Sequence, residues 1–215
     1  MTKEKKQYWL IALVAGSVII IDQIIKIAVK TTMQIGQSIP VFGSWFQLLF
    51  VENEGMAFGM AFGGSAGKLM LSLFRILAAA AVLWYLISQI KKGKCSTGVV
   101  VSLSLIFAGA IGNLIDCAFY GLIFDESYYH VARLFPPEGG YERFLHGRVV
   151  DMFYFPIIDT TWPDWLPIWG GQHFLFFNAI FNFADAAITI GVILLLFIAF
   201  FFNKKDSESV AEKIN

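Results

Sequence analysis

The stretch YWLIALVAGSVIIIDQIIKIAV, residues 8–29, decides the fold class, because it indicates a chain that folds in a lipid bilayer. It is long enough to cross the hydrocarbon core of a bilayer, which takes about 20 residues of helix. Three further stretches are at least as long and similarly apolar: residues 69–90, 98–119 and 174–202. Because lipid cannot hydrogen-bond an exposed backbone, each stretch is predicted to be a transmembrane helix.

The composition of the 215 residues agrees with this prediction, since 57% are apolar and only 15% are charged. Soluble domains average about 45–50% apolar and about 25% charged residues. The 16 basic and 16 acidic residues cancel, so the net charge does not favour a nucleic-acid partner. Two cysteines are too few for a disulfide framework or a cysteine-based zinc site, and the sequence contains no HExxH motif. We therefore expect no metal and no cofactor.

Lysines set the expected orientation, because short cytoplasmic segments of membrane proteins are enriched in lysine and arginine. They flank the apolar stretches in three groups: Lys3, Lys5 and Lys6; Lys91, Lys92 and Lys94; Lys204 and Lys205. With four spans these groups share one side of the membrane, so both termini are expected in the cytoplasm. The long connecting segments, residues 31–68 and 120–173, then lie outside.

The two outer segments differ in character. The first alternates apolar and aromatic residues with glycine breaks and is predicted to form short strands on the membrane surface. In the second, residues 125–147 are polar, whereas Trp162, Trp165 and Trp169 are typical of an interfacial aromatic belt. The expected fold is an all-α membrane protein of four transmembrane helices, with a small extracytoplasmic β-sheet and an interfacial outer loop, in a single domain over residues 1–215.

Ionisable residues inside the apolar stretches are few, and most lie toward the predicted outer ends: Asp22, Lys26, Arg75, Asp116 and Asp185. A charge at the bilayer centre costs about 2.5–3.5 kcal/mol or more, so each of these residues is expected to have a polar partner or a function. Asp22 and Lys26 are four residues apart and can neutralise one another. Asp116 lies three residues after Asn113, on one helical face. Their convergence at one depth favours a polar site near the outer surface.

The last apolar stretch carries a polar stripe, because four polar residues have helical spacing: Asn178, Asn182, Asp185 and Thr189. Asp151 lies where the outer segment returns to the membrane, and we expect it to meet Asp185. Two carboxyl groups at one desolvated site share a proton. Aspartic proteases use such a pair as base and acid. A small proton- or ion-coupled membrane transporter would use the same carboxylates and stays an open alternative, as does a non-catalytic membrane assembly factor.

Five motifs in order carry a resemblance to a known family: DQIIK at 22–26, NEGMAF at 53–58, GNLID at 112–116, VVDMF at 149–153 and FNFADAAI at 181–188. Over residues 8–202 the chain resembles the lipoprotein signal peptidases, the bacterial signal peptidase II family of membrane aspartic proteases. The resemblance implies that Asp151 and Asp185 are catalytic. It implies supporting or substrate-holding positions at Asp22, Lys26, Asn53, Gly55, Asn113, Asp116 and Asn182.

The resemblance also implies partners and location. The substrate would be a prolipoprotein whose lipobox cysteine carries diacylglycerol, and the cut would fall immediately before that cysteine. The enzyme would lie in the bacterial inner membrane, in contact with lipid and without nucleic acid, with its active site near the outer face. We expect a monomer.

The sequence departs from the family pattern at two places. Cys117 stands where the family usually has an arginine, so the role of that arginine is either dispensable or supplied elsewhere, with Arg143 and Arg148 as the candidates. The segment from about residue 124 to 147 is a long insertion, for which a lid and a partner surface are the two roles that we consider.

Overall fold

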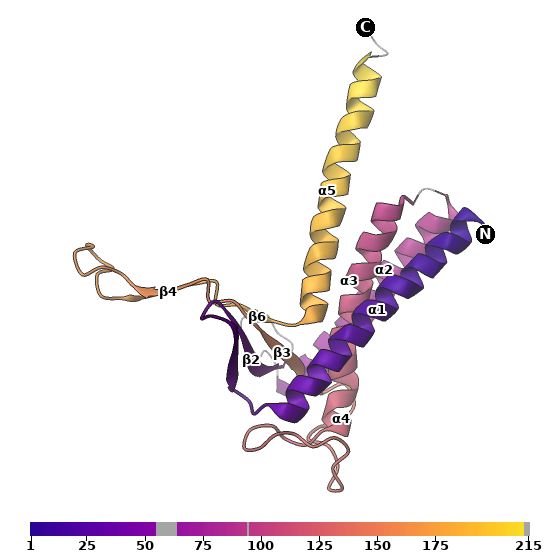
Figure 1. Ribbon diagram of the computed structural model, residues 1–215. Coiled ribbons are helices and arrows are strands. Elements are labelled where there is room, and N and C mark those ends of the chain that lie inside the picture. Colours follow the sequence, from indigo (N-terminus) through magenta and orange to yellow (C-terminus); the bar gives the residue numbers. More distant parts are fainter. Residues whose placement is uncertain (55–63, 94, 213–215) are drawn as a thin grey trace. The chain divides into compact units, whose positions relative to one another are not determined.

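The computed structural model describes residues 1–54, 64–93 and 95–212 (Figure 1). Within them, four helices are long and apolar enough to cross a membrane: Lys3–Thr32, Gly64–Lys91, Thr97–Ile123 and Phe183–Phe201. The prediction of four transmembrane helices is confirmed, and the chain is a multi-pass membrane protein.

The helices follow these spans closely. α1 is Lys3–Thr32, α2 is Gly64–Lys91 and α5 is Phe183–Glu212. The third span consists of α3 (Thr97–Ile115), a π-helical turn η2 (Asp116–Tyr120) and the short α4 (Gly121–Ile123). Short π-helical segments within helices occur frequently at functional sites, and this one begins at a predicted site residue.

The chain divides into two compact units. The helical unit comprises residues 1–23, 70–115 and 183–215, and the sheet unit comprises residues 24–69 and 116–182. α1 therefore contributes to both units, with the change at residue 24. Organisation of residues 1–215 as a single domain stays a prediction.

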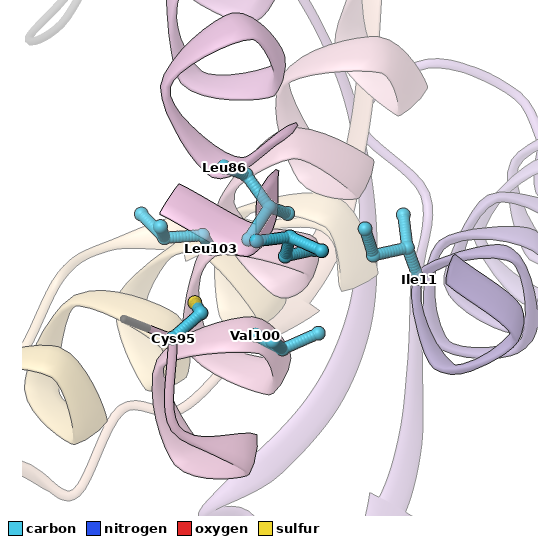
Figure 2. Close-up of a cluster of buried hydrophobic side chains, with 6 residues drawn as sticks. Ile11, Leu86, Cys95, Val100 and Leu103 are labelled. Carbon is cyan, nitrogen blue, oxygen red and sulfur yellow. The ribbon is translucent and has the colours of Figure 1, made fainter. Parts of the chain in front are cut away.

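Buried apolar side chains from α1, α2 and α3 form a core cluster in the helical unit, together with a cysteine that precedes α3 (Figure 2): Ile11, Leu86, Ile90, Cys95, Val100 and Leu103. Other apolar side chains of the same unit are exposed, among them Trp84 and Leu196. This distribution suits helices that pack on one face and meet lipid on the other.

Glycines allow α3 and α5 to pack closely. A Cβ atom on Gly109 would lie 2.3 Å from the carbonyl oxygen of Ala184, and one on Gly191 would lie 2.7 Å from that of Ser102. Small residues at such crossings are typical of membrane helices, because close backbone approach increases van der Waals contact where no hydrophobic force joins the helices. These two glycines are therefore required by the packing.

The sheet unit contains the predicted small sheet. Its four antiparallel strands run in the order β1 (Ser38–Phe42), β2 (Phe46–Asn53), β3 (Val149–Tyr154) and β6 (Ile180–Phe181). Aromatic side chains pack on it, with the ring centroids of Phe46 and Phe155 4.5 Å apart. Strands β4 (Ile158–Thr161) and β5 (His173–Phe176) form a separate hairpin that projects from the four-stranded sheet (Figure 1).

The predicted start of the last helix near residue 174 is wrong. The segment before α5 instead forms β5 and β6, and α5 begins only at Phe183. In β6, Phe181 pairs with Phe153 and Ile180 with Tyr154, so β3 supplies backbone partners that the sequence pattern does not reveal. An aromatic-rich run fits a strand as well as a helix, and here strand pairing prevails.

The insertion folds back on the end of the third span. The backbone N–H of Glu142 donates to the carbonyl oxygen of Gly121 at 2.8 Å, and that of Tyr141 donates to Phe124 at 2.9 Å. A Cβ atom on Gly140 would lie 2.1 Å from the same Gly121 oxygen, so this approach requires glycine. The insertion is thus held in the sheet unit by backbone hydrogen bonds and close packing.

Asp125 organises the outer part of this insertion. Its carboxylate accepts hydrogen bonds from the backbone N–H of Arg133 at 2.6 Å and from the Arg133 guanidinium at 2.7 Å. The His130 ring lies 3.2 Å from the same carboxylate. Burial alone would raise the pKa of Asp125, but these hydrogen bonds outweigh it and lower the pKa from 3.8 to about 2.

Gly109→Ala is expected to lower the stability of the helical unit, because the new methyl group would overlap the Ala184 backbone. Overpacking of this kind costs about 1–3 kcal/mol. Gly16→Ala is the matched control, since a Cβ atom at Gly16 would meet nothing within 4 Å. Thermal unfolding in detergent should show a lower melting temperature for Gly109→Ala alone. Equal melting temperatures would contradict the close packing of α3 on α5.

The insertion is expected to lose stability only at very low pH. Because the folded-state pKa of Asp125 is depressed to about 2, its contribution is complete above pH 4 and is lost as the pH falls through about 2. Hydrogen exchange of the Arg133 amide is the measurement, since that N–H is bonded to Asp125. Asp125→Asn should weaken its protection already at pH 7. Protection that fades between pH 6 and 4 in the wild-type protein would show that the carboxylate is not stabilised in this way.

Candidate active site

Asp151 lies in the middle of β3 and is only 4% exposed. The pairing of β3 with β2 and β6 brings two asparagines to its carboxylate. Asn182, directly after β6, donates from Nδ2 to Oδ1 at 2.7 Å. Asn53, the last residue of β2, donates from Nδ2 to Oδ2 at 3.3 Å. Both carboxylate oxygens therefore have an amide donor, which offsets the cost of removing them from water.

Asp116 fixes the strand that carries Asp151. It lies in η2 and is fully buried, and its Oδ2 atom is 2.8 Å from Nζ of Lys26 on α1. The same oxygen accepts a hydrogen bond from the backbone N–H of Val150 at 3.2 Å. Val150 immediately precedes Asp151, so the buried ion pair fixes the backbone of β3 next to Asp151.

Asp185 lies in the first turn of α5, in the helical unit. Its Oδ1 atom accepts a hydrogen bond from Nδ2 of Asn113 on α3 at 2.7 Å. The backbone carbonyl of Asp185 accepts one from the Thr189 hydroxyl at 2.9 Å, one turn later. The predicted stripe is thus correct for Asp185 and Thr189. It is wrong for Asn178 and Asn182, which precede the helix.

Asp22 binds the N-terminus of α5. Its side chain is fully buried, and Oδ1 accepts a hydrogen bond from the backbone N–H of Ala184 at 2.9 Å. The first N–H groups of a helix have no intrahelical partner, and a carboxylate there also interacts favourably with the helix dipole. A Cβ atom on Gly112 would lie 2.7 Å from Asp22, which explains why the GNLID motif begins with glycine.

The sheet unit also contains a buried charge network that the sequence patterns do not predict. The Lys30 ammonium forms an ion pair with Glu52, and both side chains are at most 1% exposed. Ser127 bridges them, with its hydroxyl 2.7 Å from Lys30 and 2.9 Å from Glu52. Arg148 reaches the other Glu52 oxygen at 3.0 Å. Lys30 follows Lys26 by one helical turn, and that spacing is the signal that could have indicated a second buried lysine.

The two arginines proposed to replace the family arginine have other partners in the sheet unit. Arg148 binds Glu126 as well as Glu52, and the Arg143 guanidinium contacts the Ser65 hydroxyl. Burial alone would lower the pKa of Arg148, but its hydrogen bonds to the two glutamates outweigh it and raise the pKa. Arg148 therefore keeps its charge and joins the insertion to β2.

The predicted site residues fall into two groups by unit. The sheet unit brings together Lys26, Asn53, Asp116, Asp151 and Asn182, whereas the helical unit brings together Asp22, Asn113 and Asp185. Gly55 lies outside the described residues. The pairing of Asp151 with Asp185 stays a prediction. Among the described residues, no cluster of three or more histidine, cysteine, aspartate or glutamate side chains could hold a metal ion.

The sequence profile of the signal peptidase (SPase) II family matches residues 14–202. The chain belongs to the signal peptidase II family. It is accordingly an aspartic peptidase of the signal peptidase II type, as the resemblance implied. This membership gives no support to the alternative of a proton-coupled transporter.

Individual relatives agree with this membership. A lipoprotein signal peptidase of Porphyromonas gingivalis is 54% identical over 178 residues, which cover 83% of this chain and 77% of that protein. One of Amoebophilus asiaticus is 35% identical over 198 residues, covering 91% of this chain and 78% of that protein. A bacterial membrane enzyme solved by the in meso method at 1.9 Å resolution has a similar fold. Its TM-score is 0.58 at 28% identity, with 88% of this chain and 92% of that chain covered.

Glu52→Gln is expected to destabilise the sheet unit strongly, because it leaves the buried Lys30 without its carboxylate partner. Removing one partner of a buried ion pair costs about 3–5 kcal/mol. Chemical unfolding in detergent is the measurement. Glu138→Gln is the matched control, since Glu138 is 68% exposed in its pair with Arg133, and its effect should stay within about 0.5 kcal/mol. Similar effects of the two substitutions would show that the charge network around Glu52 contributes little to the stability of the sheet unit.

Proposed function

We propose that the protein removes signal peptides from lipoprotein precursors, with Asp151 and Asp185 as the catalytic aspartates. The observation that carries this proposal is the pattern of amide donors on the two carboxylates. Asn182 and Asn53 donate to Asp151, and Asn113 donates to Asp185. Each of these five polar residues falls in one of the motifs that carry the family resemblance.

The amide donors suit acid–base chemistry. A side-chain NH₂ group donates hydrogen bonds without titrating, so it orients a carboxyl group and leaves proton transfer to that group. In the proposed reaction one aspartate accepts a proton from the attacking water. The other, protonated, polarises the scissile carbonyl and later gives its proton to the leaving amine. The two roles can exchange during one catalytic cycle.

The course of the chain supports a shared site for the two aspartates. Asn182 donates to Asp151, and only Phe183 and Ala184 separate Asn182 from Asp185 in the sequence. Three residues of fully extended chain span at most about 11 Å. Within its own unit each proposed catalytic aspartate has a supporting carboxylate nearby, because Asp116 binds the backbone of β3 and Asp22 binds the start of α5.

The proposed substrate is a prolipoprotein whose lipobox cysteine carries diacylglycerol, with cleavage immediately before that cysteine. The names of the relatives support this class of substrate. Four membrane spans also suit a substrate that is itself held in the bilayer by a lipid and an apolar signal peptide. We propose that the enzyme acts as a monomer in the bacterial inner membrane.

The proposed orientation places both termini in the cytoplasm and the active site near the outer face. The lysine groups at the start of α1, at and after the end of α2 and at positions 204 and 205 support it through the enrichment of basic residues in cytoplasmic segments. Asp22, Asp116 and Asp185 all lie toward the opposite ends of their spans.

Asp151→Asn and Asp185→Asn are each expected to abolish cleavage, because an amide can neither accept a proton from water nor donate one to the leaving group. The expected loss is at least about 10²–10⁴-fold in kcat. Cleavage of a diacylglyceryl-modified lipobox peptide by the purified protein in lipid is the measurement.

Glu138→Gln serves as the control, since it makes the same acid-to-amide change at an exposed position of the insertion. All variants should retain the wild-type melting temperature to within a few degrees. Turnover retained by either aspartate variant would refute the assignment and would favour a non-catalytic assembly factor.

A further inference from the structure

The hairpin of β4 and β5 ends in a loop, residues 162–172, that forms several internal hydrogen bonds. Trp162 and Gln172 pair through the hydrogen bond from the Trp162 N–H to the Gln172 carbonyl, at 2.9 Å. The Gly171 N–H donates to Trp162 at 3.0 Å, and the Gln172 side chain donates to Ile168 at 3.1 Å. Because the loop satisfies these groups internally, it keeps their hydrogen bonds when it leaves water, whereas the exposed Asp164 has to stay at the level of the headgroups.

The tip of this loop presents large apolar side chains to its surroundings. Trp165 is 78% exposed, Ile168 83% and Trp169 53%. They cover the end of the hairpin, while Trp162 packs inward on Phe174 with ring centroids 4.8 Å apart. A soluble surface seldom gathers such side chains without a partner.

Ile168 is held in a conformation that its side chain disfavours. Its φ angle is +78°, in the left-handed region, where a β-branched residue is a rare exception. Glycine or asparagine would adopt this angle with less strain. Strained positions of this kind point to function, and here the strained residue is also the most exposed apolar one of the loop.

The position and the charge pattern of the hairpin favour lipid as the partner. Residues 124–182 lie between the third and fourth spans and therefore on one face of the membrane. The sequence contains no lysine or arginine between Arg148 and Lys204, so attraction to anionic headgroups does not hold the hairpin. Tryptophan is the residue typical of the boundary between headgroups and acyl chains. Only six residues, 177–182, separate β5 from the start of α5.

We propose that this hairpin tip inserts into the headgroup–acyl boundary of the bilayer through Trp165, Ile168 and Trp169. The hairpin thus adds an attachment to the membrane beyond the four helices. The inference rests on membrane spanning and on the hairpin itself, and it does not depend on the assignment of the catalytic aspartates.

Depth-dependent fluorescence quenching of the full chain in phosphatidylcholine nanodiscs tests the proposal. A single environment-sensitive label is attached at Pro167→Cys, next to the tip residues, with Cys95 and Cys117 replaced by alanine. The matched label is at Glu138→Cys, which lies in the insertion on the same face of the membrane and is 68% exposed. Lipids with a shallow spin label should quench the tip label several-fold more strongly, whereas aqueous iodide should quench it less.

Two further arms separate insertion from folding and from electrostatics. Ile168→Gly should reduce lipid quenching without lowering the melting temperature, because glycine adopts the φ angle of +78° freely. Adding anionic phosphatidylglycerol should leave the quenching unchanged. Equal iodide access at both labels would overturn the proposal. So would protection of the tip label that arises only when a lipobox peptide or a second copy of the protein is added.

Discussion

The buried ion pair between Lys26 and Asp116 is the interaction on which the sheet unit depends. Neither charge is exposed, so each requires the other. The pair joins the last turns of α1 to η2, and the same Asp116 oxygen holds the backbone N–H of Val150. The Asp116 carboxylate has to pair with a cation because it is buried. Its position therefore sets the position of β3 and the orientation of Asp151.

In the helical unit a buried carboxylate is stabilised by the N-terminus of a helix instead of by a lysine. Asp22 is buried in α1 and accepts the N–H of Ala184, where α5 would otherwise begin with unsatisfied donors. Asp185 follows in the same turn and is held by Asn113. In both units a buried carboxylate fixes the backbone beside a proposed catalytic aspartate, and an asparagine orients that aspartate directly. Gly112 and Gly109 leave the space that these contacts need.

Much of this could be predicted from the sequence. Four long apolar stretches in a chain with few charges indicated four spans, since backbone satisfaction in lipid permits little else. The few intramembrane charges indicated where a polar site forms, and the order of the motifs indicated the family. The start of the last helix was not predictable, because the run from 173 to 181 fits both a helix and a strand. Pairing with β3 decides between them.

The sequence by itself determined the solvent, the number of spans and the residues that need polar partners, because these depend on composition and periodicity along the chain. Only the tertiary structure decided which partner each polar group receives. Lys26 binds Asp116, Lys30 binds Glu52 and Asp22 binds the start of α5. Such pairings join residues far apart in the chain, and the cost of burying a charge is met only where the fold brings its counterpart within hydrogen-bond distance.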